Sequence, residues 1–131
     1  MEQTLVIIKP DAVERGLVGE IISRFEAVGF EIANMRMVHP DEDLLRRFYA
    51  EHTQKPYFAR LIGYMCSGPS CFVLFRGDGA VERARMLVGA TDPACAAPGT
   101  IRGDMGMNLP RNSVHASDCE DAAARERQLM F

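Results

Sequence analysis

The stretch Leu5-Val6-Ile7-Ile8-Lys9, which Pro10 follows directly, is the part of this sequence that decides the fold. Its run of apolar, largely β-branched side chains is typical of a strand that is buried on both faces. Proline cannot donate a hydrogen bond to a neighbouring strand, so Pro10 ends the run. We therefore expect a buried strand that ends on Lys9.

Outward from this strand, helical and strand-like segments alternate. Apolar residues recur at helical spacing over 17–28, and Gly29 follows as a plausible C-terminal cap. The stretch 30–39 alternates loosely between apolar and charged residues, which predicts a half-exposed strand. Two consecutive helices are then expected, one opened by Pro40 and one by Pro56.

The second half of the chain continues the alternation. The apolar run 71–75 predicts a buried strand, and a helix is expected from Ala80. Positions 89–111 contain three prolines and several glycines, too irregular a composition for one element. A loop of that length inside a compact domain is usually functional or disordered.

A short fourth strand is expected over 113–116, and a last helix through 122–129, with Ser117 or Asp118 as its N-terminal cap. This order of elements predicts an α/β (α+β) fold. A ferredoxin-like four-stranded antiparallel sheet with helices packed on it is one economical arrangement. All 131 residues are expected to form a single domain, 1–131, because a chain of this length buries a core without disulfide bonds.

Composition restricts the class of protein. The chain is 47% hydrophobic and 25% charged, as ordinary globular domains are. Its net charge of −3 gives no general attraction to nucleic acid, so any phosphate site must be local. No apolar run reaches the roughly 20 residues that cross a bilayer. The four cysteines, without a CxxC pair or a secretory leader, are interpreted as reduced thiols of a cytoplasmic protein.

The three histidines differ in their neighbours. His39 at a strand end and His52 at a helix end have structural explanations, which are the more common ones for a single histidine. His115 is followed by Ser117 and Asp118 and by the start of a helix. It is therefore the candidate for chemistry.

Glu126 lies about two turns into that last helix. If its carboxylate points back toward the helix start, it can hold one ring nitrogen of His115 and leave the other nitrogen free as a nucleophile. The alternative is that Glu126 pairs with Arg125 or Arg127 on a solvated face, and the pattern alone favours that alternative.

Candidate phosphate-binding groups are Lys9, Arg85 and Arg102, with Thr91 as a hydroxyl donor. Guanidinium groups suit phosphate oxygens because their planar fork donates parallel hydrogen bonds. The sequence contains neither GxxxxGK[ST] nor GxGxxG, so a nucleotide would be bound by convergence of side chains. The cysteines and histidines lack zinc-site spacing, whereas a magnesium ion brought in on phosphates would need little more than one carboxylate, such as Asp118.

The segment Asn112-Ser113-Val114-His115-Ala116-Ser117-Asp118 resembles the active-site signature of nucleoside diphosphate kinases, N-x-x-H-G-S-D. Pro98-Gly99-Thr100-Ile101-Arg102-Gly103-Asp104 resembles the segment that precedes it in that family. Positions 4–11 and the turn 67–69 also look like family positions, so the resemblance covers nearly the whole chain.

This resemblance implies a ping-pong reaction in which His115 takes the terminal phosphoryl group of a nucleoside triphosphate as a phosphohistidine and passes it to a nucleoside diphosphate. It also implies a homo-oligomer built from dimers, either a tetramer or a hexamer, and Mg²⁺ bound with the nucleotide phosphates. The catalytic residues that it implies are His115, Glu126, Ser117, Lys9 and Tyr49. The implied nucleotide-binding residues are Lys9, Tyr57, Leu61, Arg85, Thr91, Arg102, Leu109 and Asn112, and the implied metal ligand is Asp118.

Three positions depart from the family pattern. Tyr57 replaces the usual stacking phenylalanine and adds a hydroxyl that needs solvent or a partner. Ala116 replaces glycine, which would cost on the order of 1 kcal/mol if that position has positive φ. Met105 replaces a phenylalanine, an exchange of similar volume.

Two other classes of protein compete with this prediction. One is a ligand-binding or regulatory module that has kept the fold and lost catalysis, which the retained His115, Lys9, Asn112 and Glu126 disfavour. The other is a nucleic-acid-binding protein, which the acidic balance and the lack of a basic stripe disfavour.

Overall fold

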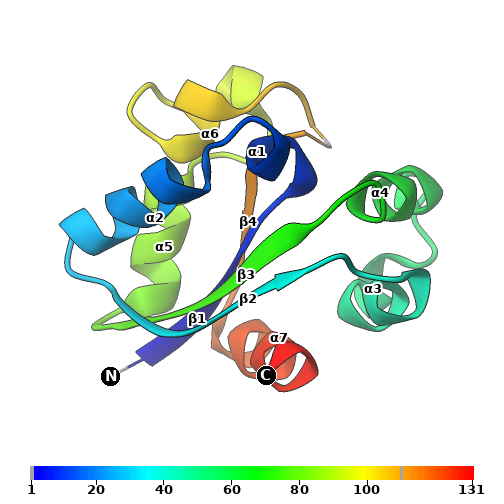
Figure 1. Ribbon diagram of the computed structural model, residues 1–131, viewed down its shortest axis with the longest axis horizontal. Helices are drawn as coiled ribbons and strands as arrows, with labels where there is room; N and C mark the ends of the chain where they lie inside the picture. Colours follow the sequence, from blue (N-terminus) through cyan, green and yellow to red (C-terminus); the bar gives the residue numbers. More distant parts are fainter. Residues whose placement is uncertain (1, 110) are drawn as a thin grey trace.

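A four-stranded sheet in the order β2-β3-β1-β4 forms the centre of the computed structural model, which describes residues 2–109 and 111–131 (Figure 1). The strands are β1 (Glu2–Ile8), β2 (Glu31–Val38), β3 (Ser70–Gly77) and β4 (Val114–Ala116). Every neighbouring pair is antiparallel. The predicted ferredoxin-like antiparallel sheet is therefore confirmed.

The helices cover the two faces of this sheet. Their bounds are α1 (Pro10–Glu14), α2 (Val18–Ala27), α3 (Glu42–Phe48), η1 (Ala50–His52), α4 (Phe58–Met65), α5 (Ala80–Val88), η2 (Pro93–Cys95), α6 (Ile101–Met105) and α7 (Glu120–Met130). Figure 1 shows α2 and α5 on one side of the sheet and α3, α4 and α7 on the other. Within the described ranges, none of these helices has the length and apolar character that a membrane crossing requires.

The strand β1 joins two hydrophobic cores. Val6 and Ile8 belong to the core beneath α2 and α5, and Leu5 and Ile7 belong to the core beneath α3, α4 and α7. All four side chains are fully buried. The prediction of a strand buried on both faces is confirmed, although the strand ends at Ile8, one residue before Lys9.

Several predicted boundaries shift by a few residues. Pro10 begins the short helix α1, which the sequence did not indicate, because proline suits a first helical turn as well as a strand end. The helix predicted from Pro56 begins at Phe58. Gly29 does cap α2: it has φ of 96°, and its N–H and that of Phe30 donate to carbonyls of the last turn.

The stretch 89–111 is more regular than its composition indicated. It contains η2 and the helix α6, whose Ile101 and Met105 are buried in the core beneath α2 and α5. Thr100 caps α6 by accepting a hydrogen bond from Gly103 N at 3.1 Å. The glycines and prolines obscured this five-residue helix, and Pro110, the third proline of the stretch, lies outside the described residues.

The last helix begins later than predicted. The N–H of Ser117 donates to Leu5 O at 3.1 Å, so the chain is still held along β1 at this point. The helix α7 starts at Glu120, and its N-terminal cap is Cys119, whose Sγ accepts from Ala122 N at 3.4 Å. The prediction of Ser117 or Asp118 as the cap is wrong for this reason.

The edge strand β2 is more exposed than the half-exposed strand predicted for 30–39. Seven of its eight residues are exposed, and β3 is its single strand neighbour in the described sheet. Its apolar side chains Ile32, Met35 and Met37 are 38%, 49% and 55% exposed. This apolar edge is a surface suited to contact with another chain.

Candidate active site

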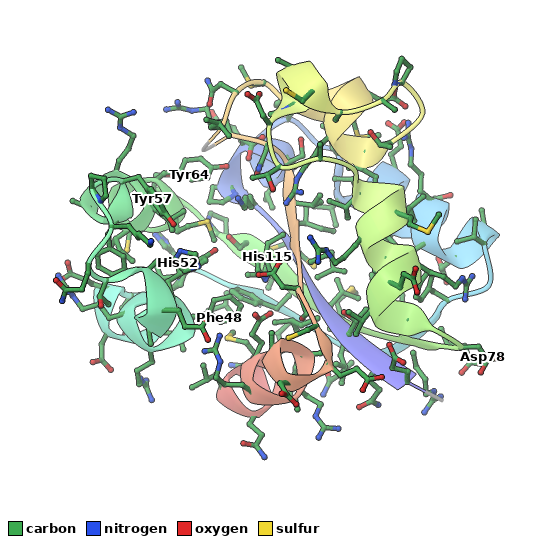
Figure 2. All side chains as sticks on the ribbon, turned by 180° about the vertical axis from the view of Figure 1, so that it is seen from behind. Phe48, His52, Tyr57, Tyr64, Asp78 and His115 are labelled. Carbon is green, nitrogen blue, oxygen red and sulfur yellow. The ribbon has the colours of Figure 1, made fainter. Side chains whose placement is uncertain are left out.

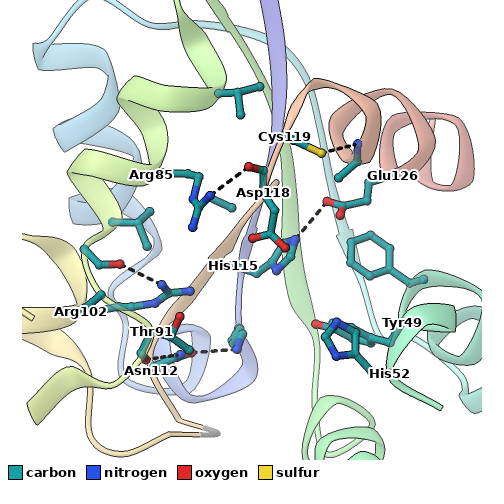
Figure 3. Close-up of a pocket in the computed structure, with 18 of the residues that line it drawn as sticks. Tyr49, His52, Arg85, Thr91, Arg102, Asn112, His115, Asp118, Cys119 and Glu126 are labelled. Atoms are coloured by element: carbon teal, nitrogen blue, oxygen red, sulfur yellow. Dashed lines mark hydrogen bonds and ion pairs between the residues drawn. The ribbon is translucent and has the colours of Figure 1, made fainter. Parts of the chain in front are cut away.

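A cavity of about 1130 Å³ lies above the β1–β4 end of the sheet, between α5 on one side and α3, α4 and α7 on the other (Figure 3). The structure brings together on its wall residues that are far apart in the sequence. The predicted site residues that line it are Lys9, Tyr49, Tyr57, Leu61, Arg85, Thr91, Arg102, Leu109, Asn112, His115, Asp118 and Glu126.

His115 is the central residue of β4, where it pairs with Ile7 of β1. The flanking Val114 and Ala116 are buried, whereas the His115 side chain is 17% exposed and reaches the cavity. Its Nε2 lies 3.0 Å from Oε1 of Glu126, which leaves Nδ1 as the other ring nitrogen (Figure 3). The strand therefore presents one imidazole to the cavity, with its orientation held by a carboxylate.

Glu126 lies on the inner face of α7 and is only 4% exposed. Arg125 does approach it, with Nη2 3.9 Å from Oε2. Because the carboxylate is buried, the alternative of a pair on a solvated face is wrong for Glu126. The burial depends on how α7 packs on the sheet, which the local charge pattern does not encode.

Ser117 lies behind the cavity wall and is fully buried. Its Oγ donates to the same Oε1 of Glu126 at 2.9 Å and accepts from Leu5 N at 3.3 Å. Ser117 thus ties the carboxylate that holds His115 to the central strand.

Lys9 follows β1 and is 6% exposed. Its Nζ donates to Asn112 Oδ1 at 2.8 Å, and Asn112 Nδ2 donates to Thr91 O at 2.8 Å. Burial, and then the positive charge of Arg102, lowers the pKa of Lys9 to about 7, while Asp11 acts in the opposite direction. A buried ammonium without a strong counter-charge is a group prepared to receive an anion.

The lowered pKa of Lys9 has a consequence for stability. From about pH 7 to about pH 10, the unfolded chain keeps the Lys9 proton and the folded chain has released it, so the free energy of unfolding rises with pH. Relative to a Lys9→Met variant, the wild type is expected to gain on the order of 1 kcal/mol per pH unit in this range. Urea unfolding at pH 7, 8 and 9 measures the difference, and a difference that does not change with pH would contradict the burial of a titrating Lys9.

Arg102 and Arg85 supply two guanidinium groups. Arg102 donates from Nη1 to Gly89 O at 3.0 Å and from Nη2 to Val114 O at 2.9 Å, and its buried Nε has no hydrogen-bond partner among the described residues. Burial and the charge of Arg85 lower the pKa of Arg102 to about 10. Arg85 donates to Asp118 O at 3.0 Å. With Lys9, these groups make a local positive site in a chain of net charge −3, as phosphate binding requires.

Aromatic rings form the opposite wall of the cavity. Phe48 and Tyr49 pack edge-on against His115, at centroid distances of 5.5 and 6.3 Å. Within 2–109 and 111–131 the buried Tyr49 hydroxyl has no hydrogen-bond partner, and burial together with the charge of Glu126 raises the pKa of Tyr49. Phe48 was not among the predicted residues, because a buried phenylalanine on a helix is ordinarily part of the core.

The two remaining histidines have different roles. His39 Nε2 lies 2.7 Å from Cys66 O, outside the residues that line the cavity, in agreement with its structural interpretation. His52 lines the cavity and contacts Tyr57, a position that its place at a helix end did not indicate. Nothing in the local pattern around His52 could have indicated this position.

Backbone geometry in the described residues decides whether alanine at position 116 is strained. The positive φ there among non-glycine residues belongs to Ser113, at 75°, and Ala116 pairs with Val6 as ordinary strand. The cost that positive φ would have imposed on alanine therefore does not arise. No group of three or more potential metal ligands occurs in 2–109 and 111–131, so a cavity carboxylate such as Asp118 fits an ion that arrives with other ligands.

A histidine held by a carboxylate, beside three cations on a ferredoxin-like sheet, has the composition of a phosphotransferase site. The family model described as nucleoside diphosphate kinase matches residues 2–131. Nucleoside diphosphate kinases of Archaeoglobus fulgidus and Schizosaccharomyces pombe are 50% and 47% identical over 100% and 99% of this chain and 87% and 86% of their own. The chain belongs to the nucleoside diphosphate kinase family.

Solved structures agree with this assignment. A crystal structure of nucleoside diphosphate kinase from Encephalitozoon cuniculi superposes with a TM-score of 0.98 at 38% identity, covering 100% of this chain and 89% of that chain. A halophilic nucleoside diphosphate kinase from Halobacterium salinarum, in complex with CDP, has a TM-score of 0.97 at 45% identity, covering 99% and 87%. The protein is a phosphotransferase with nucleoside diphosphate kinase activity.

Proposed function

We propose that this kinase activity proceeds by a ping-pong reaction through a phosphohistidine on His115. The observation that carries the proposal is the contact of 3.0 Å between His115 Nε2 and Glu126 Oε1. An ionised carboxylate only accepts hydrogen bonds, so the proton of a neutral imidazole resides on Nε2 and the lone pair on Nδ1 is free to attack.

In the first half-reaction, Nδ1 of His115 attacks the terminal phosphorus of a nucleoside triphosphate. The N–P bond forms as the bond to the bridging oxygen breaks, and the nucleoside diphosphate leaves with that electron pair. In the second half-reaction, the terminal oxygen of another diphosphate attacks the phosphohistidine and restores the neutral imidazole. Such transfers depend mostly on alignment and charge neutralisation.

The phosphates are assigned to Lys9, Arg85, Arg102 and Thr91. Their buried or convergent donors suit the charge that spreads over the transferred group. Tyr49, whose buried hydroxyl has no partner in the described part of the chain, is assigned to assist near the reacting phosphate. Magnesium, when bound with the nucleotide, would add positive charge at the phosphates, and Asp118 is the residue proposed to hold it, directly or through water.

The nucleoside is assigned to the outer end of the cavity. Tyr57 and Leu109 are 46% and 56% exposed there, and Leu61 supports the Tyr57 ring from the next turn of α4. Lys9 and Asn112 are assigned to the sugar hydroxyls. Stacking on a ring accepts any base, because every base has a π-face.

Mass spectrometry of the intact protein tests the phosphohistidine. After the protein is mixed with ATP and Mg²⁺, its mass is expected to rise by one phosphoryl group, which acid removes and alkali does not. The His115→Gln variant should stay at its original mass. Equal labelling of both proteins would overturn the assignment.

We also propose that the exposed edge of β2 joins two chains in a dimer-based oligomer, a tetramer or a hexamer. Apolar side chains at Ile32, Met35 and Met37 make this edge costly to leave in water. A free strand edge can also pair its backbone with a second copy of the same strand.

The Met35→Glu variant tests this interface. A carboxylate buried against a second apolar strand is expected to weaken association by a factor of at least about 10, and light scattering should then report a lower mass at the same concentration. Met86→Glu is the matched control, because Met86 is 70% exposed on α5, away from β2. If Met35→Glu keeps the wild-type mass, the interface lies elsewhere.

A further inference from the structure

Tyr57 differs from the usual phenylalanine by its hydroxyl, and this hydroxyl has a hydrogen-bond partner that the sequence did not indicate. The Tyr57 hydroxyl lies 2.5 Å from Nδ1 of His52, with the two rings tilted by 52° and their centroids 5.8 Å apart. Figure 2 shows both side chains at the connection between α3 and α4, on the side of the cavity that faces His115. The hydroxyl is therefore occupied, whereas the ring, 46% exposed, still offers surface to the cavity.

His52 is itself held in place. Its N–H donates to Tyr49 O at 2.8 Å, and its carbonyl accepts from Lys55 N at 2.9 Å. Its ring packs edge-on against Tyr49 at a centroid distance of 6.0 Å, and the Tyr49 ring in turn packs against His115. The contact thus connects Tyr57, at the exposed end of the cavity, to its buried aromatic wall.

A phenol beside a nucleobase can act in two ways. Its ring stacks on any base, which does not discriminate. Its hydroxyl can donate to or accept from the polar edge of a base, and such contacts discriminate between substrates because an unmatched polar group is left without a partner. Which of these dominates depends on where the hydroxyl is directed.

We propose that His52 is a positioning residue that preserves base tolerance in this chain, by holding the Tyr57 hydroxyl away from the base and fixing the ring as a stacking surface. The inference rests on the proposed nucleotide site. In this proposal His52 acts through Tyr57. His52 would have no such role if the ring at position 57 lacked a hydroxyl.

The test compares KM values for GDP, IDP, CDP and UDP as acceptors, with ATP as donor. His52→Phe keeps an aromatic ring against Tyr49 and removes Nδ1, so it is expected to widen the spread of the four KM values by about threefold to tenfold, the range that one hydrogen bond supports. Any loss of kcat should be common to all four acceptors, because the bond that forms and breaks is distant from the base.

Three further variants separate this role from a general structural one. His52→Asn places an acceptor near the position of Nδ1 and should restore the narrow spread, whereas His52→Gln, which places its amide near Nε2, should not. In the Tyr57→Phe background there is no hydroxyl to release, so His52→Phe should add less than about twofold. His39→Phe removes a histidine outside the cavity and serves as the matched control.

The outcomes distinguish this inference from the proposed function. If the wild type carries no phosphohistidine, only the covalent reaction through His115 fails, and the spread of the four KM values still decides the role of His52. If the wild type is labelled and turns over all four acceptors, but His52→Phe raises every KM by the same factor, only the role of His52 is overturned. An equal effect of His52→Phe with and without the Tyr57 hydroxyl would overturn it as well.

Discussion

The His115→Gln variant is expected to lose kcat by a factor of about 10⁴ or more, because removal of a nucleophile abolishes the covalent route and leaves only binding and charge stabilisation. The amide of glutamine can keep a hydrogen bond to Glu126 but has no lone pair able to attack phosphorus. Nucleotide binding should persist, since Lys9, Arg85 and Arg102 are unchanged. The ATP-to-diphosphate exchange rate, followed with radiolabelled ATP, measures the loss.

A matched variant makes this result specific. His39→Gln makes the same chemical change at a histidine that hydrogen-bonds Cys66 O and does not line the described cavity, so its exchange rate should match that of the wild type. If His115→Gln retained more than about one-tenth of the wild-type kcat, direct transfer between two bound nucleotides would replace the ping-pong reaction. Intersecting rather than parallel lines in initial-rate plots would report the same outcome.

The Glu126→Gln variant is expected to lose kcat by about 100-fold, with a smaller change in KM. In the wild type, one carboxylate oxygen meets both His115 Nε2 and the Ser117 hydroxyl, and the other faces Arg125. An amide has one oxygen and one NH₂ group, so the NH₂ group faces either Arg125 or Nε2 of His115. The first orientation places two hydrogen-bond donors against each other. The second orientation stabilises the wrong tautomer of His115.

The rate of phosphoryl capture by Glu126→Gln, measured by rapid quench with ATP, isolates this effect from product release. Glu42→Gln carries the same change on the exposed surface of α3, where Glu42 pairs with Arg46, and should capture the phosphoryl group at the wild-type rate. An undiminished rate in Glu126→Gln would show that the carboxylate charge is not needed to orient the nucleophile.

The departures from the family pattern illustrate how structure decides the effect of a substitution. Ala116 raised a question about backbone strain, which its regular pairing with Val6 answers. The residue with an unfavourable backbone conformation is Ser113, which has a positive φ. Its carbonyl accepts a hydrogen bond from Lys9 N at 2.9 Å. The residue next to the nucleophile is therefore in ordinary strand geometry, and no loss of rate is expected from alanine there.

The sequence by itself determined the strand around Leu5–Ile8 and the apolar stripe and glycine cap of α2, and it identified His115 as the candidate for chemistry. These features are local: burial repeats with the period of the element, and caps and motifs occupy neighbouring positions. The helix α6 and the N-terminal cap of α7 were not predicted correctly, because a short helix and an extended connection give little periodic pattern in the sequence.

Only the tertiary structure decided which side chains meet. Lys9 contacts Asn112 across 103 positions, and Ser117 contacts Leu5 across 112, because β4 lies beside β1 in the sheet. The burial of Glu126 and the contact between His52 and Tyr57 depend in the same way on how helices pack. The periodicity of a sequence indicates which face of a helix or strand is buried. A functional site combines residues of several elements, and the distances between those elements depend on strand order and helix packing.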